Sequence, residues 1–104
     1  MKTTLPVINL NGTDGATLVE WHYRVLKALR DITQLMTDVE PHGRDYPGKS
    51  ELYQQARKEH VYRMNQLAVL VKEYRDLYEG IAEQQNQCDE MRELARRLRG
   101  GATS

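Results

Sequence analysis

The sequence predicts an all-α protein, an antiparallel and coiled-coil-like helical hairpin with an extended N-terminal arm and a long second helix. Three observations lead to this prediction. Apolar residues recur in alternating steps of four and three over two long stretches, the spacing of helices that pack along their length. A segment rich in proline and glycine separates these stretches. Phe is absent and 29% of residues are charged, which is typical of a solvated helical protein.

The first 12 residues are expected to form an extended arm. Pro6 disfavours helix, and Asn11-Gly12 is a turn pair. A single strand is not stable by itself. The arm is therefore expected to lie on the helices or on another subunit. Its apolar residues are Leu5, Val7, Ile8 and Leu10.

A strongly amphipathic first helix is predicted over residues 14–40. Thr13 or Asp14 can cap its N-terminus, and Thr17 with Glu20 forms a capping box one turn later. The spacing predicts one apolar ladder facing the second helix, with three further apolar residues widening it. The ladder is Leu18, His22, Val25, Leu29, Ile32, Met36 and Val39, and the flanking residues are Val19, Leu26 and Leu35.

The hinge is predicted over residues 41–50. Pro41 and Gly43 oppose continuation of the first helix, and Pro47-Gly48 is a second turn signal. Ser50 is expected to be the N-cap of the second helix.

The second helix is predicted over residues 51–99, followed by a flexible tail over residues 100–104. A kink or loosened region is expected in residues 80–87, because Gly80 weakens a helix and the glutamine-rich run after it is polar where a core is expected. Before that region the spacing predicts a ladder of His60, Met64, Leu67, Val71, Tyr74, Tyr78 and Ile81.

The two predicted helices differ greatly in length, about 40 Å against about 75 Å at 1.5 Å per residue. The end of the second helix must then extend beyond the first and expose apolar residues. A two-helix hairpin also buries little surface. Self-association into a homo-oligomer is therefore expected. The candidate interface residues are Trp21, Leu70, Tyr74, Leu77, Tyr78, Ile81, Met91 and Leu98.

Composition argues against several classes of partner. The 15 basic and 15 acidic residues give a net charge of zero, so no global field attracts nucleic acid or an anionic membrane. The basic end at Arg92, Arg96, Arg97 and Arg99 is mixed with acids, and nucleic-acid binding is not expected.

No signal peptide or membrane-spanning stretch is expected. The single cysteine, Cys88, excludes an internal disulfide.

Residues 43–50 match the letters of the phosphate-binding loop, GxxxxGK[ST]. The context does not fit, because a helix precedes the loop and Pro47 removes a backbone donor. A weaker alternative is an anion or partner site around the hinge, using the free N–H groups at a helix start. Its candidate residues are His42, Arg44, Asp45, Tyr46, Lys49, Tyr53, Arg57 and His60.

Neither catalysis nor a bound metal is predicted. His22, His42 and His60 lack the spacing of a helical metal site, and two of them lie on apolar ladders. No nucleophile triad, catalytic carboxylate pair or glycine-rich cofactor turn is present in the sequence. We expect no cofactor.

Three segments resemble a group of small tailed-bacteriophage proteins. They are residues 8–13 (INLNGT), residues 43–47 (GRDYP) and Glu59-His60. The group has an INLNGT-like start, a GRDYYP-like turn and an EH pair in the second helix, so this chain has one tyrosine before the proline instead of two. The resemblance covers residues 8–82 and implies a phage protein of the virion or the bacterial host cytoplasm.

The expected function is therefore a non-enzymatic phage protein that self-associates and acts in virion structure or assembly, with other phage or host proteins as partners. The alternative is a counter-defence protein that binds a host protein or sequesters an anionic nucleotide signal at the hinge.

Overall fold

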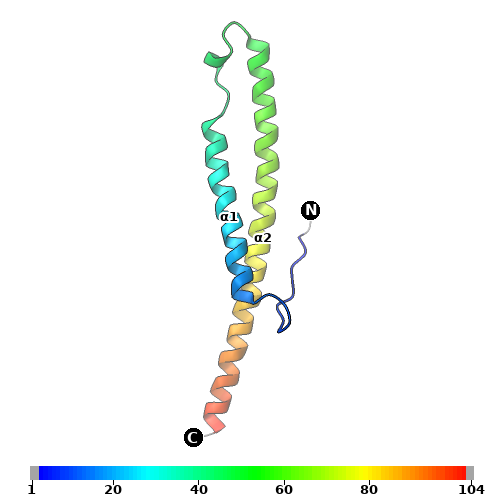
Figure 1. The fold of residues 1–104 in the computed structure, drawn as a ribbon, viewed down its shortest axis with the longest axis vertical. Coiled ribbons are helices and arrows are strands. Elements are labelled where there is room, and N and C mark those ends of the chain that lie inside the picture. Colours follow the sequence, from blue (N-terminus) through cyan, green and yellow to red (C-terminus); the bar gives the residue numbers. More distant parts are fainter. Residues whose placement is uncertain (1–2, 103–104) are drawn as a thin grey trace.

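The computed structural model describes residues 3–102, with side chains described for residues 3–100. Helix α1 covers Gly15–Asp38, a short 3-10 helix η1 covers Gly43–Asp45, and helix α2 covers Ser50–Ala102. Helix α1 lies antiparallel to α2, with Gly15 at its start lying against Gln85, and the C-terminal end of α2 continues beyond α1 (Figure 1). The predicted helical hairpin is confirmed.

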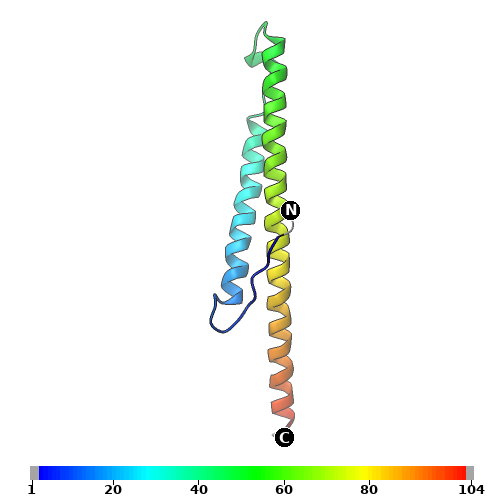
Figure 2. The same ribbon diagram turned by 90° about the vertical axis from the view of Figure 1, so that its right-hand side faces the viewer.

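The molecule is a rod. Its extents are 83 × 23 × 18 Å and its radius of gyration is 22.4 Å, whereas a compact domain of this length would have about 13 Å. The N-terminal arm runs beside α2 near the level at which α1 begins (Figure 2). Three segments therefore meet at this level.

Asp14 caps α1. Its carboxylate accepts hydrogen bonds from the Thr17 backbone N–H at 3.2 Å and from the Thr17 hydroxyl at 3.0 Å. The predicted capping box of Thr17 with Glu20 is wrong, because Thr17 bonds Asp14 and Glu20 instead accepts from Arg24 Nε at 2.8 Å. The Thr17 side-chain and backbone bonds lower the pKa of Asp14, because they stabilise its charged form.

Helix α1 ends two residues before the predicted boundary. The hinge then makes a set of tight backbone turns, with Asp45 N–H donating to His42 O, Tyr46 N–H to Gly43 O and Lys49 N–H to Tyr46 O, each at 3.0 Å. Gly48 has φ of 66°, a value that favours glycine. Helix α2 begins at Ser50 itself, so the predicted N-cap is displaced by one residue.

Helix α2 is a single element through residues 80–87, so the expected loosened region is not found. Gln84 bonds the arm, while Gln85 and Gln87 bond Asp89 and Glu83 one turn away on α2, so these polar side chains have partners without a break in the helix. The helix also continues past the predicted end at Arg99 to Ala102, so residues 100–102 of the expected flexible tail are helical. The last residues of that tail, 103–104, lie outside the described part.

The residues of α1 that face α2 differ from those of the predicted ladder. The residues of α1 that are buried or half-buried and recur in steps of four and three are Gly15, Val19, His22, Leu26, Leu29, Thr33 and Met36; we call this set the inner ladder. Only three members of the predicted ladder belong to it. The structure places the predicted Val25, Ile32 and Val39 in solvent, with 37%, 42% and 71% of their surface exposed. The predicted α2 ladder, residues 60–81, is half-buried or buried throughout and is confirmed.

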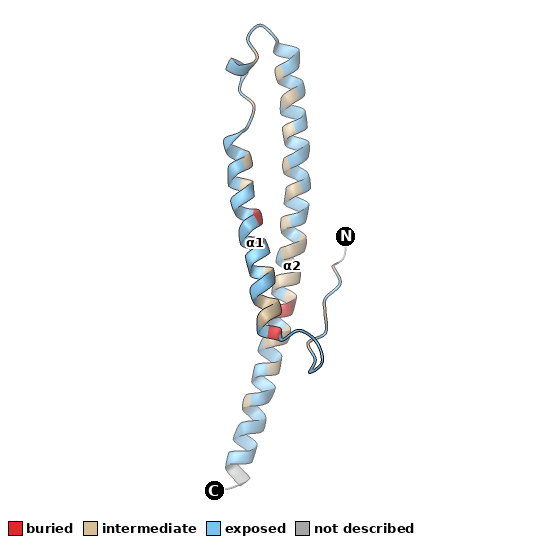
Figure 3. Ribbon diagram, viewed as in Figure 1, coloured by how far each residue is buried: buried red, intermediate tan, exposed pale blue. Residues whose placement is uncertain are grey.

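The core is small. Among residues 3–100 the buried large side chains are Leu26, Leu29 and Ile81, and buried positions are sparse along the rod (Figure 3). The facing ladders are joined by ring contacts, with centroids 6.2 Å apart for His22 and Tyr74. Such a core is minimal for a chain of this length.

Candidate interaction surfaces

The arm is anchored to α2 by the side chain of Gln84. Its Nε2 donates to the carbonyl of Pro6 at 2.8 Å, and its Oε1 accepts from the backbone N–H of Ile8 at 3.2 Å. In an extended segment these two backbone groups point to the same side, so one carboxamide satisfies both in the way that a neighbouring strand would. The polar run predicted to weaken the helix therefore binds the arm.

Gly80 has a matching role one turn earlier. A Cβ at this position would lie 2.7 Å from both Cδ atoms of Leu5, so the absence of a side chain allows the arm to lie close to the helix. Gly15, the first residue of α1, is similarly enclosed, because a Cβ there would meet Gln85 and the Cδ1 of Ile8. Two glycines therefore bring three segments together.

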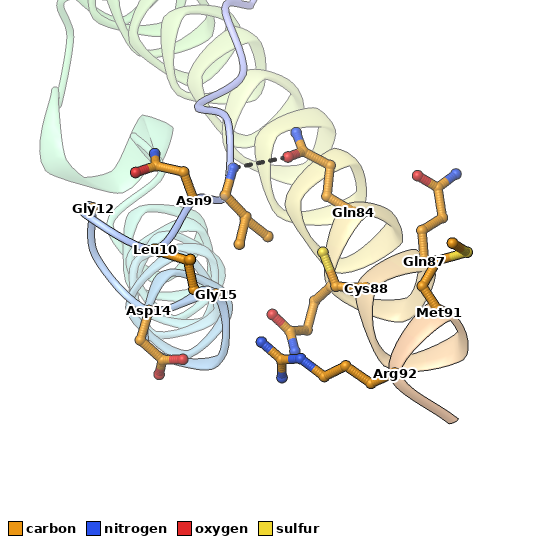
Figure 4. A pocket seen from close by; sticks show the side chains of 12 residues that line it. Asn9, Leu10, Gly12, Asp14, Gly15, Gln84, Gln87, Cys88, Met91 and Arg92 are labelled. Atoms are coloured by element: carbon orange, nitrogen blue, oxygen red, sulfur yellow. Dashed lines mark hydrogen bonds between the residues drawn. The ribbon is translucent and has the colours of Figure 1, made fainter. Parts of the chain in front are cut away.

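A groove of about 580 Å³ lies below this junction, between the arm, the start of α1 and α2. Figure 4 shows its residues: Asn9, Leu10 and Gly12 come from the arm, Asp14 and Gly15 from the start of α1, and Gln84, Gln87, Cys88, Met91 and Arg92 from α2. Asp14 and Arg92 are its charged residues. The mixture of amide, thiol and thioether groups offers apolar contact and hydrogen bonds, and it contains no arrangement typical of acid–base or nucleophilic catalysis.

Helix α1 carries a second heptad ladder, displaced by one residue from the inner ladder. We call it the outer ladder, and every one of its positions is apolar. Apart from the half-buried Leu18, its residues are exposed, Trp21 at 53% and Leu35 at 63%. Two adjacent ladders of this kind are typical of a helix that packs against two others. The outer ladder consists of Leu18, Trp21, Val25, Ala28, Ile32, Leu35 and Val39.

The end of α2 forms a third apolar surface. Gly15 lies against Gln85, so α1 no longer covers α2 beyond residue 88 or so (Figure 1). The roughly 15 residues that follow extend about 22 Å and expose Met91 at 66%, Leu94 at 51% and Leu98 at 68%. We call residues 88–102 the overhang. It agrees with the prediction, made from the lengths of the two helices, that the end of the second helix extends beyond the first.

The predicted interface residues divide into two groups. Trp21, Leu70, Met91 and Leu98 are exposed and Leu77 is half-buried, so their surfaces remain available to another chain. Three others pack within the hairpin. Ile81 has no exposed surface, and its prediction as an interface residue is wrong because α1 and the arm already enclose its helix there. Tyr74 and Tyr78 are half-buried and contact rings of α1, His22 and Tyr23 respectively.

The structure brings together only some of the predicted hinge residues. The Tyr46 and Tyr53 rings lie with centroids 6.1 Å apart, and the Arg57 guanidinium lies 5.8 Å from the Tyr53 centroid. Lys49 lines a shallow hollow of about 430 Å³ with these two tyrosines.

The other predicted hinge residues stand apart from this hollow. His42, Arg44 and Asp45 are exposed and do not line it, and the half-buried His60 lies two turns further along α2. Three backbone N–H groups of the hinge, those of Asp45, Tyr46 and Lys49, donate to carbonyls of the hinge and are therefore not free to bind a phosphate.

The basic end of α2 is largely neutralised by its own acids. Arg96 and Arg97 both bond Glu93, at 2.6 and 3.1 Å for the shortest contacts. The bonds from Arg96 and then Arg97 lower the pKa of Glu93. Within the described part of the chain, no group of three or more His, Cys, Asp or Glu side chains is arranged to hold a metal.

Comparison with known proteins finds no matching family model, no similar curated protein and no similar solved structure. No helix in residues 3–102 is long and apolar enough to cross a membrane.

Sequence reasoning missed two features of these surfaces. In the sequence pattern Gln84 and Gly80 have the character of defects in a core, and nothing in their spacing relates them to residues 5–8. The outer ladder was detectable, because its apolar residues repeat without exception every three and four positions. The predicted ladder instead alternated between residues of the outer and inner sets.

Proposed function

We propose that this chain is a non-enzymatic protein that associates with further copies of itself and acts in particle structure or assembly through helix–helix contacts. The observation that carries the proposal is the outer ladder, a complete apolar heptad repeat whose residues are exposed apart from the half-buried Leu18. A hairpin with three buried large side chains in that range gains substantial stability by covering it.

The overhang supports the same proposal. It presents the exposed Met91, Leu94 and Leu98 at heptad-compatible spacing on the part of α2 that extends beyond α1 (Figure 1). Two exposed helical surfaces at different heights along a rod allow one copy to contact more than one other copy. That arrangement suits extended assemblies.

The biological setting of the proposal is a tailed bacteriophage, with the protein in the virion or in the cytoplasm of the bacterial host. Its support is the resemblance of residues 8–13 and 43–47 to small phage proteins. The counter-defence alternative has less support, because the hinge residues His42 and Arg44 do not converge on the hollow that Lys49 lines.

Sedimentation equilibrium of the full chain, from micromolar to near-millimolar concentration, tests self-association. We expect a dimer or a larger species. A mass of 12.1 kDa, that of the single chain, across the whole range would contradict the proposal.

The particle role is tested by mass spectrometry of purified virions and of assembly intermediates from infected cells. Absence of the chain from both would exclude that role and leave self-association unaffected.

A further inference from the structure

We infer that the outer ladder of α1 binds the outer ladder of a second copy, antiparallel and in one register. This inference rests on the proposed self-association and specifies its surface, direction and alignment. In heptad notation the outer ladder occupies positions a and d: Leu18, Val25, Ile32 and Val39 are a, and Trp21, Ala28 and Leu35 are d. The inner ladder then occupies b and e.

The direction follows from which flanking positions remain free. In a two-helix contact, positions e and g flank the a/d seam. The e positions here are His22, Leu29 and Met36, which face α2 within the hairpin. Only the g positions can supply charges at the new contact. Parallel helices pair g with e of the partner, so charged g residues would meet apolar residues of the hairpin. Antiparallel helices pair g with g.

The register follows from the sign of the g charges. The g positions are Thr17, Arg24, Asp31 and Asp38. One antiparallel alignment places Arg24 opposite Asp31 of the second copy, and the two-fold symmetry repeats the pair. Shifting by one heptad toward the hinge pairs Arg24 with Asp38 but also sets Asp31 against itself, and shifting the other way sets Arg24 against itself. Like charges facing each other oppose association.

The same alignment forms continuous apolar layers. It pairs Leu18 with Leu35, Val25 with Ala28, and Trp21 with Ile32, each pair occurring twice by symmetry. All of these residues lie within Gly15–Asp38. Arg24 is available for the new pair, because its present bond to Glu20 joins two exposed side chains and such surface pairs contribute little. Asp31 joins none of the ion pairs found among residues 3–100.

Disulfide trapping tests direction and register. In a Cys88→Ala background, Leu18→Cys and Leu35→Cys chains are prepared separately and mixed under mild oxidation. The antiparallel register predicts that the mixture forms a disulfide between position 18 of one chain and position 35 of the other, and that neither chain alone cross-links efficiently. Efficient self-cross-linking of each variant would indicate parallel packing and overturn the inference.

Charge exchange provides a second test that does not depend on cysteine variants folding. Arg24→Asp and Asp31→Arg each place like charges across the contact, and each should weaken the dimer roughly tenfold. The double exchange restores the opposite pairs and should return the Kd to within about threefold of the original. Arg30→Asp is the matched control, because the exposed Arg30 at position f lies on the side of α1 opposite the outer ladder, and it should leave the Kd unchanged.

The outcomes separate this inference from the proposed function. A protein that self-associates normally in Arg24→Asp and Asp31→Arg, with no disulfide between positions 18 and 35, would use another surface such as the overhang. That result overturns the inference alone. A chain that stays monomeric throughout overturns both.

Discussion

At the scale of single residues, the arm depends on two positions of α2 that a helix pattern would reject. Gln84 supplies both a donor and an acceptor to the arm backbone. Gly80 supplies space for Leu5. Gly80 has a low helix propensity, and Gln84 places a polar side chain where an apolar one is expected. In each case the contact with the arm compensates for this loss of stability in α2.

Replacing Gln84 with Met should release the arm while leaving the hairpin folded. Methionine keeps the length of the side chain but removes two hydrogen bonds, together worth about 1–3 kcal/mol of local stability. The measurement is hydrogen exchange at the Ile8 amide, which should become faster. Gln87→Met is the control, because the bond that Gln87 makes is to Glu83 on its own helix, at 3.3 Å. Unchanged exchange at Ile8 in Gln84→Met would show that this anchor is dispensable.

Replacing Gly80 with Ala should stabilise helix α2 and at the same time weaken the binding of the arm to it. The new methyl favours α2 by up to about 1 kcal/mol, but it occupies the position of the Leu5 methyl groups. We expect no fall in the melting temperature and faster exchange at Ile8. In the control Gly100→Ala, a Cβ meets nothing within 4 Å, so arm protection should persist. A protected Ile8 amide in Gly80→Ala would contradict the proposed close approach.

At the scale of elements, the start of α1 depends on one carboxylate. The sequence left Thr13 and Asp14 as alternative caps, and the structure selects Asp14, because its oxygen accepts from both the backbone and the hydroxyl of Thr17. A cap fixes the first turn, and Gly15 at that turn touches the arm and α2. Loss of the cap should therefore loosen the junction of all three segments.

The Asp14 cap predicts a pH dependence with a definite sign. Its pKa in the folded chain is lowered from the ordinary value of 3.8, chiefly by the Thr17 side-chain bond. Its stabilisation is therefore complete above that value and is lost as the pH falls through the lowered folded pKa. NMR titration of the Asp14 carboxyl should give a pKa below 3.8.

Substitution at the cap checks the same interaction. Asp14→Ala should lower the melting temperature at neutral pH, because the first-turn donors lose their acceptor. The difference from the original chain should shrink in acid. Thr13→Ala is the control and should melt like the original. Equal effects of the two substitutions would remove the preference for Asp14.

At the scale of the whole molecule, the balance of buried and exposed surface favours assembly. The rod is 83 Å long and 18 Å thick, so almost every residue lies near solvent. One helix, α1, offers two apolar ladders and the hairpin uses only one. The overhang adds exposed apolar residues at the C-terminal end of α2. A chain of this shape gains most of its further burial from other chains.

The melting temperature should therefore rise with protein concentration. Association that involves only the folded chain stabilises it by mass action. Circular dichroism over a hundredfold range of concentration is the measurement. The outer-ladder variant Leu35→Gln should reduce the dependence, while Arg30→Gln, a change on the opposite face, should not. A melting temperature that is independent of concentration would contradict self-association.

The sequence by itself determined two helices of unequal length, the hinge between them and the overhang, because these depend on local breakers and on a repeat that any helix must obey. The ladder of α2 was also predictable, since its apolar stripe is dominated by one seam. Only the tertiary structure decided which seam of α1 faces α2. Residues 18–39 offer apolar positions at a, b, d and e, and such a repeat fits a partner on either side. The roles of Gln84 and Gly80 were likewise decided by folding, because their partners at residues 5–8 are brought close only when the whole hairpin has formed.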